Sequence, residues 1–142
     1  MANAIKKAIY LCRRHGGGTE IIMKFCWSTL NVKNMEETLH FYKDIVGLRE
    51  NGRFPAGPKM EIVFLGDGDT QIELICDKSK KEFDYGSDIS WGFQVDSLER
   101  LMTTLRENGV DIAQGPVQPN PHTRFIHVND PNGMRIQFVE MM

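Results

Sequence analysis

Cysteine, long apolar runs and an excess of one charge are all scarce in this chain. The three cysteines, Cys12, Cys26 and Cys76, lie far apart and form no C-x-x-C pair, so neither a disulfide scaffold nor a zinc knuckle is indicated. No apolar run approaches the roughly 20 residues of a membrane-spanning helix. The formal net charge is −2, which favours neither nucleic acid nor an anionic membrane as a partner. We therefore expect a cytoplasmic protein that binds neither.

The first part of the chain differs from the remainder. Residues 1–22 are rich in lysine and arginine and include a run of three glycines, and their apolar stretch from 8 to 12 is shorter than the roughly 7–15 residues of a signal peptide core. We expect residues 1–22 to be an N-terminal extension that is either disordered or the product of a non-native start. The folded domain is then residues 23–142.

An internal repeat is the strongest organisational signal. Val32 and Val95 lie 95 − 32 = 63 positions apart, and the same spacing joins Met35 to Leu98, Glu36 to Glu99, Leu39 to Met102, Tyr42 to Leu105 and Lys43 to Arg106. Each half reads as a strand, a helix and three strands. We predict an α+β fold of two tandem β-α-β-β-β modules, residues 23–77 and 88–142. Together they are expected to form an open barrel-like curved sheet with a central trough.

Hydrophobic alternation and capping residues place the individual elements. Strands are predicted at residues 24–32, 48–54, 60–65, 70–76, 89–95, 110–112, 124–128 and 134–140. One helix is predicted to begin at the N-cap Asn34 and to end at Gly47, and a second to lie between Ser97 and Gly109. Residues 115–122 contain three prolines and are predicted to be a loop.

Polar residues at matched positions of the two halves mark a candidate site. Gln137 interrupts the large apolar side chains of the last predicted strand, and Glu73 takes the same place in the strand 70–76. We expect both side chains to face the shared trough.

Three motifs carry a resemblance to a known family. They are V-K-N-M-E-E-T-L-H-F-Y-K-D-I-V-G-L at residues 32–48, T-Q-I-E-L-I at 70–75 and D-P-N-G-M-R-I-Q-F-V-E at 130–140. With them the chain resembles the vicinal oxygen chelate superfamily, which includes glyoxalase I, extradiol dioxygenases, fosfomycin-resistance proteins and bleomycin-binding proteins. The resemblance implies the paired-module fold and frequent homodimers, but the fold hosts several chemistries.

The resemblance also implies where a metal would be held. Glyoxalase I-like members place four ligands, usually His or Gln, Glu, His and Glu, on the first, fourth, fifth and eighth strands. The matching positions here are Trp27, Glu73, Ser90 and Gln137. Because tryptophan has no lone pair to give and serine and glutamine are weak ligands, we expect no metal cofactor. The alternative is a divalent Ni, Zn, Fe or Mn ion held by Glu73, Gln137 and His127.

The first functional hypothesis is a glyoxalase/bleomycin-resistance-like protein with a degenerate metal site, which binds a small molecule in the trough. The residues expected to contact the ligand are Trp27, Glu73, Ser90, His122, His127 and Gln137. An aromatic such as Trp27 suits a planar ligand, although it would serve equally as a core residue. A lone strand histidine such as His127 is more often structural than a ligand, whereas His122 belongs to the predicted proline-rich loop over the trough.

Two further hypotheses remain. In one, the chain is a lyase or isomerase of the glyoxalase I (lactoylglutathione lyase) type, with Glu73 as metal ligand or general base. The structural alternative for Glu73 is a simple hydrogen bond with Gln137 or with a hydroxyl such as that of Ser90. In the other, the chain is an interaction module without a ligand. A homodimer is expected in each case, because an open paired sheet leaves strand edges that need covering.

Overall fold

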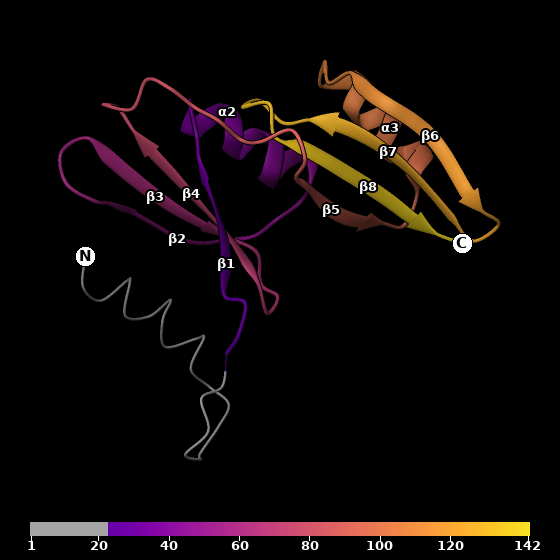
Figure 1. Ribbon diagram of the computed structural model, residues 1–142, viewed down its shortest axis with the longest axis horizontal. Helices are drawn as coiled ribbons and strands as arrows, with labels where there is room; N and C mark the ends of the chain where they lie inside the picture. Colours follow the sequence, from indigo (N-terminus) through magenta and orange to yellow (C-terminus); the bar gives the residue numbers. More distant parts are fainter. Residues whose placement is uncertain (1–22) are drawn as a thin grey trace, which may run out of the picture. The chain divides into compact units, whose positions relative to one another are not determined.

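Strands with alternating apolar residues form one four-stranded sheet in the first half of the chain. The computed structural model describes residues 23–142, and the prediction for residues 1–22 lies outside them. The strands are β1 (Trp27–Asn31), β2 (Glu50–Pro55), β3 (Met60–Leu65) and β4 (Gln71–Asp77). Their order is β1-β4-β3-β2, with β1 parallel to β4 and the other neighbours antiparallel (Figure 1).

A helical segment packs on one face of this first sheet. It consists of α2 (Met35–Leu39) and a π-helical continuation, η1 (His40–Ile45). The side chain of Asn34 accepts a hydrogen bond from the N–H of Glu37 at 3.0 Å, which is the predicted N-cap. Met35, Leu39 and Tyr42, which follow one another at helical spacing, are buried. Phe41, in the π-helical continuation, is also buried.

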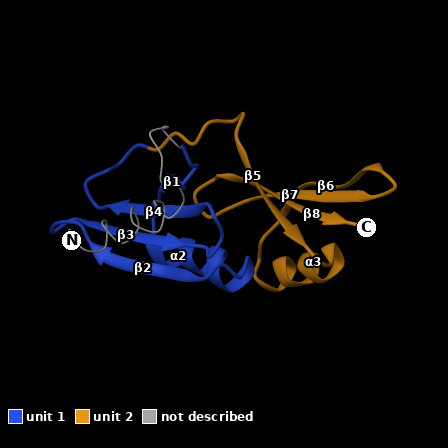
Figure 2. Ribbon diagram, turned by 90° about the horizontal axis from the view of Figure 1, so that it is seen from below, with its two compact units in different colours: residues 1–82 blue, residues 83–142 orange. Residues whose placement is uncertain are grey.

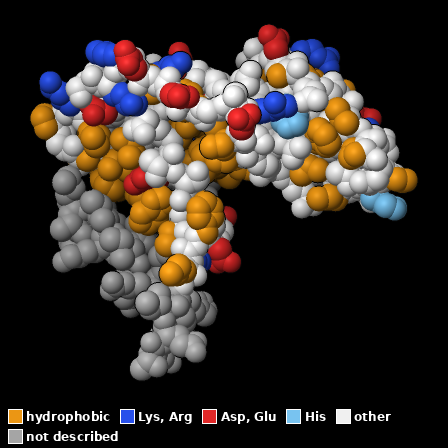
Figure 3. Space-filling model, in the orientation of Figure 1, with side chains coloured by type: hydrophobic (Ala, Val, Ile, Leu, Met, Phe, Trp, Pro, Cys, Tyr) orange, Lys and Arg blue, Asp and Glu red, His pale blue; other side chains and the backbone are white. Residues whose placement is uncertain are grey.

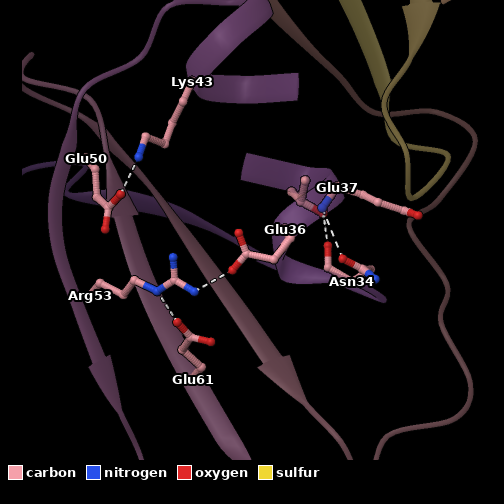
Figure 4. A network of polar contacts seen from close by, with 8 residues as sticks. Asn34, Glu36, Glu37, Lys43, Glu50, Arg53 and Glu61 are labelled. Carbon is pink, nitrogen blue, oxygen red and sulfur yellow. Dashed lines mark hydrogen bonds and ion pairs between the residues drawn. The ribbon is translucent and has the colours of Figure 1, made fainter. Parts of the chain in front are cut away.

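Ion pairs identify the face of the first sheet that the helix covers (Figure 4). The guanidinium of Arg53 on β2 pairs with Glu36 of α2 at 2.6 Å and also with Glu61 of β3. Arg53 is the register partner of Val63, which is completely buried. Arg53 and Val63 therefore face the helix, and their strand neighbours face the other way.

The second half of the chain repeats this arrangement. It contains β5 (Ser90–Val95), α3 (Leu98–Glu107), β6 (Ile112–Asn120), β7 (Thr123–Asn129) and β8 (Arg135–Met141), with the strand order β5-β8-β7-β6. The chain divides between Glu82 and Phe83 into two compact units (Figure 2). The predicted α+β class and the order of strand, helix and three strands in each half are confirmed. No helix in residues 23–142 is long and apolar enough to cross a membrane.

The largest correction concerns the proline-rich segment. The sequence predicted a strand at 110–112 and a loop at 115–122, but residues Ile112–Asn120 form the nine-residue strand β6. Because β6 is the outer strand of its sheet, prolines there cost no hydrogen bond on the outward side. The register with β7 shifts several times along this strand. His122 consequently lies in the turn between β6 and β7, and it is exposed.

The first residue of α3 is held by a carboxylate from β8. The N–H of Leu98 donates to Glu140 Oε2 at 2.7 Å, and Arg124 Nη2 donates to the same oxygen at 2.9 Å. These two contacts, the backbone bond first, lower the pKa of Glu140 below its usual 4.5. Since a cap and an ion pair both need the charged form, Glu140 links α3 to the second sheet.

The depressed pKa predicts how stability depends on pH. A carboxylate with a lower pKa in the folded state stabilises it above the ordinary pKa, and this contribution is lost as the pH falls through the folded pKa. Urea unfolding of the wild type and of Glu140→Gln should therefore differ at pH 7, and the difference should shrink below about pH 4.5. Glu107→Gln, which removes an exposed carboxylate from α3, should match the wild type. A difference that does not change with pH would contradict this role of Glu140.

Candidate functional site

One face of the first sheet carries aromatic side chains and a carboxylate. Phe54 and Phe64 alternate with Arg53 and Val63, so they lie on the face opposite α2. The strand register pairs Phe64 with Glu73 and Glu73 with Thr29. We call Trp27, Thr29, Phe54, Phe64 and Glu73 the aromatic face.

The three rings of the aromatic face contact one another. The ring centroids of Trp27 and Phe64 are 5.6 Å apart in an edge-on arrangement, and those of Phe54 and Phe64 are 6.2 Å apart and stacked. Phe64 lies between the other two and is 5% exposed, whereas Trp27 and Phe54 are half-buried. The arrangement offers the indole of Trp27 and the ring of Phe54 as partly accessible aromatic surface.

Glu73 is hydrogen-bonded within its own sheet. Thr29 Oγ1 donates to Glu73 Oε1 at 2.8 Å. The sequence predicted a hydrogen bond with Gln137 or with a hydroxyl such as that of Ser90, and the hydroxyl in the structure is that of Thr29. The sequence contained one indication of this bond: Thr29 is two residues after Trp27 and therefore lies on the same side of the strand. The strand residues that share this face include the carboxylates Glu73 and Asp77 but, within the described part of the chain, no lysine or arginine.

Exposed apolar side chains lead into β1. Met23 and Phe25 are 88% and 70% exposed, and the carbonyl of Phe25 accepts a hydrogen bond from Thr70 Oγ1 at 2.8 Å. Figure 3 shows hydrophobic side chains gathered at the surface of this unit beside β1. The exposed apolar surface of the first unit thus extends beyond the N-terminal end of β1.

The second sheet also has a face that its helix does not cover. Glu140 touches the start of α3, so Ile136 and Phe138 face the helix, and Arg135 and Gln137 face away. The register places Gln137 between Gly92 of β5 and His127 of β7. We call this surface the polar face; its members are Ser90, Gly92, Gln114, Phe125, His127, Arg135 and Gln137.

His127 is the most deeply buried titratable residue of the polar face. Its side chain is 8% exposed, and its Nδ1 has no hydrogen-bond partner among the described residues. The ring centroids of Phe125 and His127 are 5.4 Å apart in an edge-on arrangement. Burial, and secondly the charge of Arg135, hold the pKa of His127 below its usual value. The imidazole is therefore neutral at pH 7.

The structure distributes the predicted site residues over the two faces. Trp27 and Glu73 share the aromatic face, and Ser90, His127 and Gln137 share the polar face. His122 lies on neither, because it belongs to the exposed turn after β6 and its N–H bonds to Asn120. The trough that the repeat predicts stays a prediction.

The residues at the metal-ligand positions do not suit a metal. The indole of Trp27 offers no lone pair, and the oxygens of Ser90 and Gln137 are weak donors to Ni²⁺ or Zn²⁺. Residues 23–142 contain no group of three or more His, Cys, Asp or Glu side chains that could hold a metal ion.

Known proteins match almost the whole described chain. The model of the glyoxalase/bleomycin resistance protein/dioxygenase superfamily matches residues 24–138. A lactoylglutathione lyase of Neisseria meningitidis serogroup A is 26% identical over 129 residues, covering 83% of this chain and 91% of the relative. A glyoxalase family protein from Bacillus cereus superposes with a TM-score of 0.76 at 16% identity, over 89% of this chain and 99% of its own. TnmS3, an antibiotic-binding protein from Streptomyces sp. CB03234, gives a TM-score of 0.63 at 19% identity, over 88% and 100%.

Proposed function

Because the chain belongs to the glyoxalase/bleomycin resistance protein/dioxygenase superfamily, we propose that it is a small-molecule-binding protein with a degenerate metal site. The ligand is a planar aromatic cation, and it binds on the aromatic face of the first unit. The observation that carries this proposal is the carboxylate of Glu73 on the same sheet face as a contacting cluster of three aromatic rings.

The aromatic rings supply the apolar part of the interaction. Trp27 and Phe54 are half-buried, so a flat ligand that covers them removes apolar area from water at about 25 cal/mol per Å². The face of an indole also attracts a cation, an effect of about 0.5–2 kcal/mol depending on solvent exposure. Both effects favour a ligand that is flat and positively charged.

Glu73 supplies the charge that selects the ligand. Its Oε1 accepts the hydrogen bond from Thr29, which fixes the carboxylate and leaves Oε2 to a donor on the ligand. Because no lysine or arginine shares the face in the described residues, an anionic ligand would be repelled and a neutral one would gain nothing from the charge. Charge-assisted hydrogen bonds are about twice as strong as neutral ones.

We propose that binding needs no metal. Of the four family ligand positions, only Glu73 keeps the usual residue type, and a large aromatic, Trp27, stands at the first. An indole at a ligand position cannot bind a metal, but it can contact an aromatic ligand. The antibiotic-binding protein of Streptomyces is an example of a protein with this fold that binds a small molecule. A homodimer stays a prediction.

Benzamidine and benzamide test this proposal, because they share one shape and differ in charge. In Trp91→Phe, Trp27 is the remaining tryptophan, and its fluorescence should change saturably with benzamidine, with a dissociation constant of about 1 mM for so small a ligand. Benzamide should bind at least about tenfold more weakly. No response to either compound would show that the aromatic cluster is only a packed core, and equal responses would show that Glu73 does not select a charged ligand.

The second candidate function is a lyase of the glyoxalase I type. It is favoured by the 26% identity with a relative named lactoylglutathione lyase. In this case Glu73 would act as the general base, since its free Oε2 can accept a proton from a carbon next to a carbonyl. The same substitution of Glu73 separates the two functions, as described in the Discussion.

A further inference from the structure

The ring of His127 carries a nitrogen that has no hydrogen-bond partner among residues 23–142. The side chain is 8% exposed, and Nδ1 is buried and makes no hydrogen bond with the described residues. A buried polar atom in this condition destabilises the folded state, and native proteins rarely contain one without a reason. The neighbouring Gln137 does not supply the partner. Its Oε1 lies over Gly92, 3.8 Å from where a Cβ of that residue would be.

Arg135 makes the surroundings of this nitrogen positive. It lies on the same face, two residues from Gln137 on β8, and after burial its charge is the second cause that lowers the pKa of His127. The strand positions that share the polar face hold no aspartate or glutamate among residues 90–141. The charge here is therefore opposite to that of the aromatic face.

We propose that the polar face binds a carboxylate, which Arg135 and His127 hold together. The planar fork of a guanidinium matches the two oxygens of a carboxylate. A neutral imidazole can carry its proton on Nδ1 and donate a third hydrogen bond. This contact gives the orphaned nitrogen its partner.

The present contacts of Arg135 show how a carboxylate would enter. Arg135 Nη2 donates to Gln114 Oε1 at 2.5 Å, so an amide oxygen already occupies the place of one carboxylate oxygen. Gln114 and Arg135 are both exposed, and either side chain can move without disturbing the core. A carboxylate replaces a neutral acceptor by a charged one, which strengthens the bond.

Phe125 narrows the class of ligand to carboxylates with an apolar group. Its ring lies edge-on to His127 at 5.4 Å and is half-buried. A ligand with a flat apolar body can cover this ring while its carboxylate reaches Arg135. Benzoate is the simplest compound of that kind, and benzamide has nearly the same shape without the charge.

The test follows the ring signals of His127 by two-dimensional proton–nitrogen NMR at fixed pH, assigned through the variant His127→Gln. Benzoate should shift these signals saturably, with a dissociation constant of about 1 mM, and benzamide should not. Arg135→Gln, at an exposed position that leaves the fold intact, should weaken benzoate binding by about tenfold or more. Arg106→Gln, which removes the same charge from exposed α3, should bind benzoate like the wild type.

Three outcomes would overturn the carboxylate site. They are a non-saturating shift, an equal response to benzamide, and unchanged binding in Arg135→Gln. The site does not depend on the proposed function, because the two probes report on different units. If benzoate fails while benzamidine still alters Trp27 fluorescence, the carboxylate site alone is wrong.

Discussion

Replacing Asp130 by alanine should lower the free energy of unfolding by about 2–4 kcal/mol, because two buried N–H groups lose their acceptor. Asp130 is 4% exposed, and its Oδ1 accepts hydrogen bonds of 2.8 Å from the N–H groups of Asn132 and Met134. Asn132 and Met134 are themselves 4% and 3% exposed, so water cannot replace the carboxylate at either donor. Urea unfolding followed by circular dichroism measures the loss.

Two matched variants separate this effect from a general effect of removing an acid. Asp130→Asn keeps one side-chain oxygen as acceptor and should lose clearly less stability than Asp130→Ala. Asp67→Ala removes an exposed aspartate from the turn between β3 and β4 and should change the free energy of unfolding by less than about 0.5 kcal/mol. If Asp130→Ala were as stable as Asp67→Ala, the turn at residues 130–134 would not depend on the carboxylate of Asp130.

Replacing Glu73 by glutamine should weaken the binding of benzamidine by roughly 10- to 100-fold and leave benzamide binding unchanged. The amide keeps the size of the side chain and its hydrogen bond with Thr29, but it removes the charge that a cationic ligand needs. A hydrogen bond to a charged group contributes about 1.5–3 kcal/mol, which corresponds to that range of affinity. Trp27 fluorescence in the Trp91→Phe background measures both compounds.

The control for this substitution is Glu37→Gln, which removes an exposed carboxylate from α2 in the same unit. It should bind benzamidine like the wild type. If both variants lose affinity to the same degree, the net charge of the unit and not the position of Glu73 attracts the ligand.

The same variant also decides between a binding protein and a lyase. In a lactoylglutathione lyase assay, a protein that uses Glu73 as base should lose turnover in Glu73→Gln by about 10²-fold or more. A wild type without turnover that binds benzamidine supports the binding function. Turnover that survives in Glu73→Gln ends the lyase hypothesis for this residue.

Local patterns were sufficient to predict most elements of the fold. The strand β3 begins and ends where its apolar run places it, at Met60 and Leu65. Asn34 and Ser97 cap the two helices through their side chains, because a cap depends on residues within one turn of the chain. Buried Phe138, at 1% exposed, follows from the period of two in the last strand. The prediction of β6 failed because prolines disfavour a strand by local rules, and only its place at the sheet edge permits them.

The sequence by itself determined the repeat, the capped helices and which side chains share a face of each strand. The family resemblance implied that Trp27 and Glu73 line one trough, and the structure places both on one face of the first sheet. Tertiary structure alone decided the partners across strands, since these depend on register between distant segments. The hydrogen bond from Thr29 to Glu73 joins positions 44 residues apart. Nδ1 of His127, which has no hydrogen-bond partner in the described part of the chain, is likewise buried only through folding. Burial is a property of the packed chain and not of any one segment.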